Sequence, residues 1–419
     1  MKKNNSEYLK KNYALNIFYF SALTLLIGFY YNEDGTGLAL SGDFRDTLPY
    51  VVELKKNLFV DPTPWTLHFP LHYILFSIVD TFLNQIKLTR LFFCFLSILV
   101  PVLFYKCLKI KYGNYYKANY LILSSTIFFV PGFRYSAIWA NDHITASISF
   151  LISIIFLLKW LKLSHDLKQR KIIYVFYSTF SLALTCYSRQ YYVIFFLIFL
   201  YIFYKNLTLS NFLKVTFFCF IVSLPGFFIL YKYPGLFKQL SFTINIYNNI
   251  FGNFSALLVY TLPIFFFNFI KIKNNIINIK KFFYIFCISF FMFILLENKL
   301  DYKNTLSLGA FFVISKNIFG NFFLFYITVI LGVTFTLVIA EYKIDFLVIF
   351  LIIFTFAGSV VIQKYFEPMF YFLFFLLMKT NYRKIFLNES KSATFLFLSC
   401  VIYYFVVISD ILYKIKITL

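Results

Sequence analysis

The sequence predicts an all-α, polytopic transmembrane protein. Of its 419 residues, 61% are hydrophobic and only 13% are charged, and a soluble domain with this balance has too few polar residues to cover its core. Apolar runs recur at about 20 residues, the length at which a helix crosses a bilayer. The net charge of +22 fits basic loops that hold cytoplasmic helix ends beside anionic lipid, so we infer no nucleic-acid partner.

The apolar runs predict about 13 spanning helices. The stretch 67–84 is apolar as well, but His68, Pro70, His72 and Asp80 interrupt it, and we predict an interfacial helix there, in the first outer loop. The predicted spans are 14–31, 88–107, 118–133, 142–160, 172–187, 190–204, 212–231, 255–270, 282–296, 320–340, 344–362, 366–379 and 393–413.

Loop charges predict the orientation of these helices. With the N-terminus in the cytoplasm, most Lys and Arg fall in loops on the cytoplasmic side and most Asp and Glu fall on the other side, as the positive-inside rule requires. A full span at 67–84 would invert every later loop and place the basic segments 159–171 and 271–281 outside. We therefore predict a multi-pass protein of an inner or plasma membrane, with its unusual polar loops on the extracytoplasmic side.

No Gly/Ser-rich linker, charged block or repeat interrupts the chain, so we predict one transmembrane domain, 1–419. Its N-terminal module, 1–205, contains most of the polar loops and is expected to be catalytic. The remainder, 206–419, is predicted to be a more variable helical module.

The first outer loop carries the candidate general base. Asp43 and Asp46 lie three residues apart, so on a helix they would share a face. A carboxylate shielded by apolar walls has a raised pKa and can take a proton from a hydroxyl. We interpret Asp43, which follows a turn-like Gly42, as catalytic. Asp46 is either a second acid that orients the acceptor or a solvated loop residue.

Asp142 opens the predicted span 142–160. In one interpretation Asn141 or Asp142 is the N-cap of this helix, and its side-chain oxygen accepts hydrogen bonds from backbone N–H groups. In the other, Asp142 is a second acid that orients the acceptor, or forms with His143 a ligand pair for a divalent metal. Two residues do not define a metal site, so the presence of a metal stays open.

Three basic residues are candidates for binding a lipid phosphate. Arg189 lies at a tight turn between two apolar runs, where an unpaired Arg costs at least ~2.5 kcal/mol, and its planar guanidinium fits a phosphate in bidentate fashion. Lys364 and Arg134 are further candidates for the same phosphate. The alternative for Arg189 and Arg134 is anchoring to lipid headgroups.

Other polar residues of these loops are predicted to line a substrate pocket. His68 and His72 have the i, i+4 spacing of a helical metal pair, but Pro70 lies between them and no acid of a HExxH motif accompanies them. This favours polar contacts at the interface. The other predicted pocket residues are Tyr187, Gln190, Tyr365 and Glu367.

Several segments match a family pattern in order along the chain. They are Gly42-Asp43, His68-Phe69-Pro70-Leu71-His72-Tyr73, Thr89-Arg90-Leu91-Phe92, residues 134–142, residues 184–190 and residues 363–368. This order resembles the GT-C superfamily of polytopic glycosyltransferases, which includes protein O-mannosyltransferases, aminoarabinose transferases and dolichyl-phosphate-sugar transferases. The Ser188-Arg189-Gln190 turn is also similar to a short motif of the dolichyl-phosphate-glucose α-1,2-glucosyltransferases.

The resemblance implies transfer of a sugar from a polyprenyl-phosphate donor to a hydroxyl of a lipid, glycan or protein acceptor, with inversion, at the extracytoplasmic face. Asp43 matches the catalytic acid of the family and would deprotonate the acceptor. Arg189, with Lys364 or Arg134, would hold the departing phosphate. Some members of the family use a divalent metal and others do not, so the resemblance assigns no cofactor.

Two other classes of function are weighed against this one. A transporter or flippase of lipid-linked glycans would carry charges and broken helices near mid-bilayer in both halves, whereas the predicted helix interiors are nearly uncharged. An O-antigen-type polymerase or ligase usually has a large Arg-rich outer loop late in the chain. The late loops of this chain, 297–317 and 363–368, contain no Arg.

Overall fold

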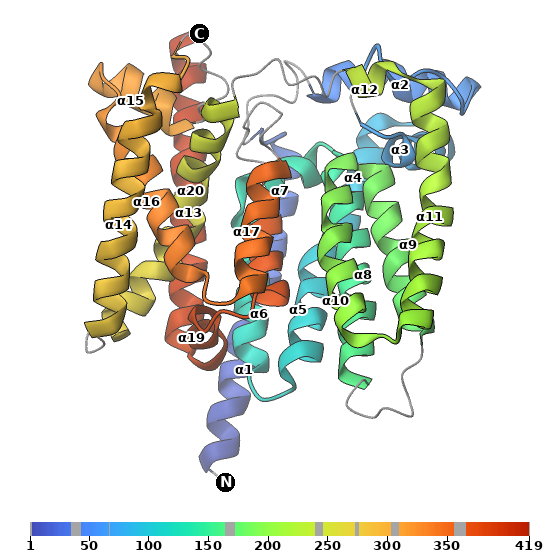
Figure 1. The fold of residues 1–419 in the computed structure, drawn as a ribbon. Helices are drawn as coiled ribbons and strands as arrows, with labels where there is room; N and C mark the ends of the chain where they lie inside the picture. The colour runs from blue at the N-terminus through green and yellow to red at the C-terminus, as the bar shows by residue number, and fades with distance from the viewer. Residues whose placement is uncertain are drawn as a thin grey trace. The chain divides into compact units, whose positions relative to one another are not determined.

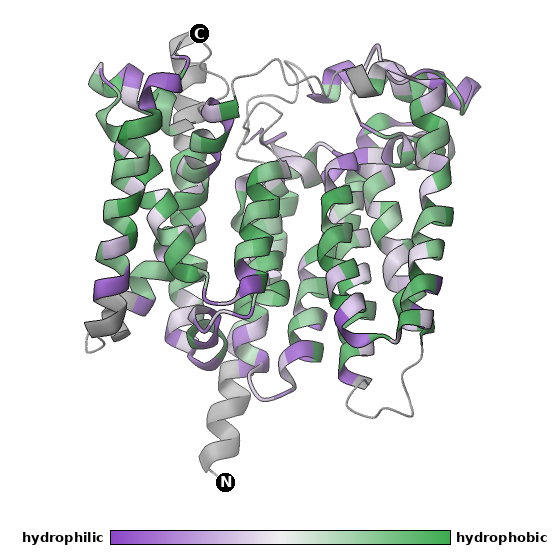
Figure 2. Ribbon diagram, in the orientation of Figure 1, coloured by the Kyte–Doolittle hydropathy of each residue, from purple (hydrophilic) through white to green (hydrophobic). Residues whose placement is uncertain are grey.

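The computed structural model describes residues 2–34, 43–66, 68–163, 172–238, 246–272, 276–302, 310–355 and 366–418. Within these ranges the regular structure is helical and no strand occurs, which confirms the predicted all-α class. Figure 2 shows hydrophobic residues along the middle of the helices and hydrophilic residues gathered at their ends. Helices that cross a bilayer have this distribution.

The chain forms two compact units. The first contains residues 1–239 and 400–419, and the second contains residues 240–399. The module boundary expected at 205/206 lies inside the first unit, at the end of α10.

The first unit is helical throughout its described residues, and its helices carry the labels of Figure 1. In chain order they are α1 (Lys2–Tyr30), α2 (Asp43–Lys56), α3 (Leu71–Leu83), α4 (Ile86–Ser97), α5 (Leu99–Tyr112), α6 (Lys117–Ser125), η1 (Thr126–Phe129), α7 (Pro131–Ile138), α8 (His143–Leu163), α9 (Ile173–Ser188), η2 (Gln190–Ile194), α10 (Phe195–Asn206), α11 (Leu209–Lys232) and α12 (Gly235–Lys238).

The second unit is likewise helical in its described residues. Its helices are α13 (Ile246–Ile272), α14 (Ile276–Leu296), η3 (Glu297–Lys299), α15 (Ala310–Phe319), α16 (Phe323–Ile339), α17 (Lys343–Thr355), α18 (Met369–Phe372), η6 (Leu373–Leu377) and α19 (Tyr382–Asn388). Helix α20 (Ser390–Thr418) begins in the second unit and continues into the first.

Seven helices in the described part of the chain are long and apolar enough to cross a membrane, and an eighth span results if the bent segment from α6 to α7 is counted as one. These helices agree with the prediction of several membrane spans, but the predicted number, about 13, is not confirmed. The seven are Lys11–Tyr30, Ile86–Tyr112, His143–Lys162, Leu209–Lys232, Ile246–Asn268, Lys280–Lys299 and Ser390–Ile408.

Helix length explains the difference in the number of spans. The run predicted at 172–187 is α9, which has only 16 residues. The run predicted at 366–379 is divided between the short α18 and the π-helical turn η6. Hydrophobic residues continue across such breaks, so composition alone does not reveal where a helix ends.

Two short helices lie between α1 and α4. Helix α3 has 13 residues and is too short to be counted as a span, in keeping with the interfacial helix predicted there. Helix α2 was not predicted, because its sequence is largely polar. It lies across one end of the upright helices of the first unit (Figure 1). Its Lys55 pairs with the buried Asp80 of α3 at 2.5 Å, which ties the two helices together.

The segment from α6 to α7 bends by 68°. Pro131 stands in the first turn of α7, where a residue without an N–H group loses no helical hydrogen bond. Every residue of α7 is buried. The bent helix thereby carries Arg134, Tyr135 and the turn that follows into the polar region described below.

Close helix packing characterises the second unit. A Cβ atom at Gly332 of α16 would lie 2.1 Å from the backbone oxygen of Phe254 in α13, so the two helices approach this closely only because the residue is glycine. Beside this contact, the hydroxyls of Ser255 and Thr328 are hydrogen bonded at 2.9 Å. Such pairs satisfy polar groups that have no access to water.

Candidate functional site

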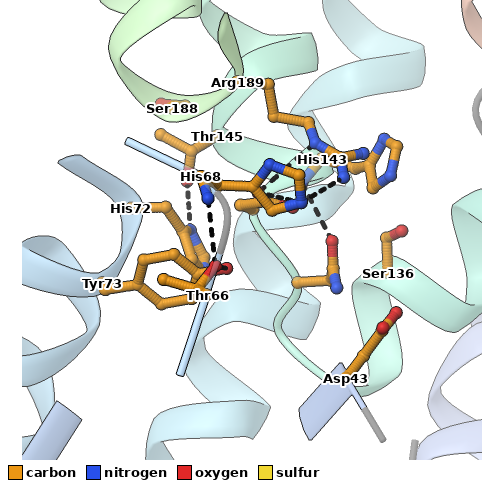
Figure 3. Close-up of polar contacts among 12 residues, drawn as sticks. Asp43, Thr66, His68, His72, Tyr73, Ser136, His143, Thr145, Ser188 and Arg189 are labelled. Carbon is orange, nitrogen blue, oxygen red and sulfur yellow. Dashed lines mark hydrogen bonds and ion pairs between the residues drawn. The ribbon is translucent and has the colours of Figure 1, made fainter. Parts of the chain in front are cut away.

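One end of the first unit gathers polar side chains from four segments that are distant in sequence (Figure 3). Figure 3 labels Asp43 at the start of α2, His68 and His72 at the entry to α3, His143 at the start of α8, and Arg189 directly after α9. Asp142, the residue before α8, joins them through its contact with Arg189. All six were candidate site residues in the sequence.

A buried ion pair lies within this group. Arg189 Nε is 3.3 Å from Asp142 Oδ2, and the two residues are 3% and 0% exposed. Arg189 Nη2 also lies 2.9 Å from Nε2 of His68. Because a guanidinium can only donate, His68 Nε2 accepts this hydrogen bond, and the imidazole is neutral with its proton on Nδ1. The arginine is therefore held in place by two partners.

The two acids in the first turn of α2 have different surroundings. Asp43 is half-buried, and its Oδ2 accepts a hydrogen bond of 2.9 Å from the hydroxyl of the buried Tyr135. Asp46 is exposed and accepts a hydrogen bond from Arg45, also exposed, at 3.0 Å. An exposed pair of this kind contributes little to stability. The geometry thus favours the solvated alternative for Asp46 and sets Asp43 apart.

Asn141 and Asp142, which precede α8, make different contacts, and these distinguish the N-cap role from the other roles that the sequence left open. Asn141 Oδ1 accepts a hydrogen bond of 3.3 Å from the backbone N–H of His143, whereas the Asp142 carboxylate faces Arg189. The His143 side chain is 5% exposed, and its ring lies beside Arg189 in Figure 3.

The turn between α7 and α8 has an unusual residue at its centre. Ala140 has φ = 51°, and the next residue, Asn141, donates its N–H to the carbonyl of Ser136 at 2.8 Å. This is the Schellman arrangement, in which glycine normally takes the left-handed position. An alanine there costs roughly 1–2 kcal/mol, so other contacts must hold the turn.

His72 makes two such contacts. Its Nε2 lies 2.7 Å from the carbonyl oxygen of Ala140, and its Nδ1 lies 2.8 Å from the hydroxyl of Thr145 in α8. The side chain is 1% exposed, and burial lowers the pKa of His72 below its ordinary value of 6.5. His72 therefore contacts protein groups through both ring nitrogens.

The histidine pair does not form a helical metal site. His68 precedes α3, whereas His72 lies in its first turn, so the i, i+4 spacing does not place both rings on one helix face. Among the described residues, no three His, Cys, Asp or Glu side chains gather in a way that could hold a metal ion. The Asp142 carboxylate, proposed as a ligand with His143, faces a guanidinium.

Arg134 is paired with an acid that the sequence did not single out. Its Nε and Nη2 atoms lie 2.7 and 2.5 Å from the two carboxylate oxygens of Glu33, and Nη2 also donates to the carbonyl of Thr24 at 2.9 Å. The ring of Tyr404 lies 4.5 Å from this guanidinium. The sequence suggested a lipid phosphate or lipid headgroups as partners of Arg134. In the structure its partners are protein groups instead.

Tyr187 contacts an interrupted helix. Pro225 lies inside α11, and near it the hydroxyl of Tyr187 donates to the carbonyl of Val222 and accepts from the N–H of Gly226 at 3.3 Å. In a regular helix this N–H and this carbonyl would bond to each other. The tyrosine hydroxyl is thus inserted into the backbone ladder of α11.

The other predicted pocket residues lie elsewhere or outside the described residues. Gln190 begins η2 and is half-buried. Glu367 belongs to the second unit, where it is 3% exposed and accepts a hydrogen bond from the hydroxyl of Tyr260. Lys364 and Tyr365 lie outside the described residues.

Arg90 is a residue whose role the sequence did not indicate. It is 7% exposed, its guanidinium lies 3.8 Å from the centre of the Trp139 ring and 5.4 Å from that of Phe44, and its Nε donates to the carbonyl of Ile138 at 3.2 Å. Arg90 thereby supports Phe44, the neighbour of Asp43. In the sequence, Arg90 is a charge at the start of an apolar run and part of the segment Thr89-Arg90-Leu91-Phe92 noted above, but neither observation indicates its partners.

Comparison with known proteins assigns this chain to no family. No protein-family model matches it, and neither a curated protein nor a solved structure matches it significantly.

Proposed function

We propose that this protein is a membrane glycosyltransferase that moves a sugar from a polyprenyl-phosphate donor to an acceptor hydroxyl, with inversion at the anomeric carbon. The observation that supports the proposal is the gathering of Asp43, His68, His143 and Arg189 at one end of the first unit (Figure 3). A carboxylate at a helix start and a buried guanidinium are the two groups that this reaction needs most. The resemblance to GT-C glycosyltransferases supplies the substrate class.

Asp43 is the general base of the proposed reaction. Its carboxylate takes the proton of the acceptor hydroxyl while the hydroxyl oxygen forms a bond to the anomeric carbon. The bond between that carbon and the phosphate oxygen breaks, and the lipid phosphate leaves with the electron pair. The hydrogen bond from Tyr135 to Asp43 Oδ2 orients the carboxylate.

Arg189 stabilises the charge that develops on the departing phosphate. Its guanidinium is fixed before substrate arrives by Asp142 and His68, and a cation that needs no rearrangement is effective in a buried site. Asp142 balances the positive charge in the resting protein.

The test is sugar transfer in membranes that contain the protein, with a panel of radiolabelled polyprenyl-phosphate hexoses as donors. Asp43→Asn should lower the rate about a hundredfold or more, and Arg189→Ala about a hundredfold. Asp46→Asn is the matched control, because Asp46 lies in the same first turn of α2 but is exposed; it should retain the wild-type rate.

Thermal stability in detergent should accompany each rate, with Arg189→Lys as a second variant in case the alanine protein does not fold. NMR of the product should show the inverted anomer. Undiminished transfer by Asp43→Asn removes Asp43 from the mechanism. Absence of transfer by the wild-type protein with every donor of the panel overturns the proposed function.

A further inference from the structure

We infer that His72 is a positioning residue, which clamps the turn between α7 and α8 and thereby fixes Asp142 beside Arg189. The sequence suggested that His72 lines the substrate pocket. Its contacts point instead to a role within the protein, since its ring joins three elements: α3, the turn after α7, and α8. The functional part of this inference rests on the proposed sugar transfer, whereas the structural part does not.

The chemistry of the two hydrogen bonds defines the state of the ring. A carbonyl oxygen only accepts, so His72 Nε2 carries the proton that it donates to Ala140 at 2.7 Å. In the neutral ring, Nδ1 then accepts from the hydroxyl of Thr145 at 2.8 Å. Both nitrogens are used, and the side chain is 1% exposed. The ring has no polar atom left for a substrate or a metal.

The turn needs this clamp because of Ala140. Its backbone is in the left-handed region, at φ = 51°, which a residue with a Cβ atom adopts only when its surroundings hold it there. The carbonyl of the same residue accepts the bond from His72. Asp142 is two residues further along the chain, so a turn that relaxes moves this carboxylate.

The position of Asp142 sets that of Arg189. The carboxylate lies 3.3 Å from Arg189 Nε and 3.9 Å from His68 Nε2. A shift of about 1 Å in such a group typically costs a hundredfold in rate. The influence of His72 therefore passes through the turn and Asp142 to the guanidinium that we assign to the phosphate.

Four variants test this chain of contacts. His72→Phe removes both hydrogen bonds with a ring of similar size, and Thr145→Val removes only the one at Nδ1. Ala140→Gly removes the strain of the left-handed residue, and the double variant His72→Phe/Ala140→Gly asks whether an unstrained turn still needs the clamp. Thr145→Val preserves shape and one hydrogen bond, so it serves if His72→Phe does not fold.

The first readout needs no enzymatic activity. The chain has 4 histidines, so ¹⁵N-histidine NMR gives few signals, and the one lost in His72→Phe should be neutral with its proton on Nε2. With ¹⁵N-arginine, the Nε proton of Arg189 should exchange slowly with water in the wild-type protein. We expect exchange at least tenfold faster in His72→Phe, a smaller increase in Thr145→Val, and slow exchange restored in the double variant.

The second readout is the transfer assay with polyprenyl-phosphate hexose. Per mole of folded protein, His72→Phe should lower kcat/KM for the donor about tenfold or more, and the added Ala140→Gly should raise it again. Normalisation to folded protein removes the effect of a variant that folds in lower yield.

The positioning role is overturned if the His72 signal shows a proton on Nδ1, or if His72→Phe and Thr145→Val both leave the Arg189 exchange rate unchanged. A wild-type protein that transfers no sugar overturns the proposed function. The NMR measurements then test by themselves whether His72 holds the turn and Arg189 in place.

Discussion

Individual charged residues of the first unit differ in role because they differ in partners. Arg189 and Arg134 are both arginines near the ends of apolar segments, and the sequence alone treats them alike. The structure pairs Arg134 in bidentate fashion with Glu33, which lies 101 residues away along the chain. It places Arg189 between Asp142 and His68. Such partners cannot be predicted from the residues that neighbour each arginine in the sequence.

The close approach at Glu33 depends on a glycine, which gives a prediction. A Cβ atom at Gly28 would lie 2.4 Å from Glu33 Oε2 and 2.6 Å from Arg134 Nη2. Gly28→Ala should therefore force the ion pair apart and destabilise the protein by about 1–3 kcal/mol, seen as a lower thermal midpoint in detergent. Leu23→Ala is the control, since Leu23 is 53% exposed on the same helix. Equal midpoints for the two variants would contradict the argument.

The buried His72 predicts a dependence of stability on pH. Burial lowers its pKa, Asp142 and the hydrogen bond to Ala140 oppose this effect, and Arg189 adds to it. Below pH 6.5 the unfolded chain binds a proton at this histidine while the folded protein does not. Stability should fall as the pH drops through and below 6.5, by up to about 1.4 kcal/mol per pH unit, until the folded pKa is reached.

Thermal midpoints at pH 7.5 and pH 5.5 measure this effect. His72→Gln has no titrating group at the position, so its midpoint should change less between the two pH values than that of the wild-type protein. The same change in both proteins would show that His72 does not contribute.

At the scale of elements, the interrupted helix α11 provides a third prediction. Tyr187→Phe removes the hydroxyl that joins the carbonyl of Val222 to the N–H of Gly226. Two partly buried backbone groups lose a partner, so the variant should be less stable by about 1–3 kcal/mol. Tyr231→Phe, at an 87% exposed tyrosine of α11, should have no effect.

A double variant tests the mechanism behind this effect. Pro225→Ala restores the missing N–H group and lets α11 close its regular ladder. In that background the hydroxyl of Tyr187 is dispensable, and Tyr187→Phe should cost less. A cost that stays the same would mean that the hydroxyl acts elsewhere.

The sequence predicted where apolar helices occur but not how long they are. The hydrophobicity of a segment indicates whether it lies in an apolar environment or in water. It does not indicate where the backbone hydrogen bonds of a helix are interrupted, as they are at Pro131 and after Ser188. Helix α2 was missed because a polar amphipathic helix leaves no apolar run. Asp43, Asp142 and Arg189 could be selected as candidates because charges are rare in this chain. Their partner Tyr135 was not, because tyrosine is common here.

At the scale of the whole molecule, the first unit is built from both ends of the chain. Residues 400–419 belong with residues 1–239. The hydroxyl of Tyr404 donates to Glu33 Oε2 at 2.9 Å, and its ring lies 4.5 Å from the guanidinium of Arg134. A residue of the last helix thus completes an ion pair between two early segments.

This contact predicts that Tyr404→Ala lowers the stability of the first unit by about 1–3 kcal/mol, because the paired charges lose a hydrogen bond and a cation–π contact. Tyr404→Phe retains the ring and should lose about half as much. Phe405→Ala changes the adjacent residue, which is 59% exposed, and should leave the thermal midpoint unchanged. If Phe405→Ala lowers the thermal midpoint equally, the loss of stability comes from any truncation in this helix and not from the contacts of Tyr404.

The same contact has a consequence for biosynthesis. Glu33 and Tyr404 are 371 residues apart, and ribosomes add about 5–20 residues per second. The ion pair cannot form before Arg134 is made, and about 270 further residues must be added before Tyr404. The nascent chain therefore spends about 14–54 seconds with this ion pair lacking its aromatic contact. A chain that ends before residue 404 lacks the hydrogen bond and the ring contact that Tyr404 gives to this ion pair, and we expect it to be degraded faster than the full chain.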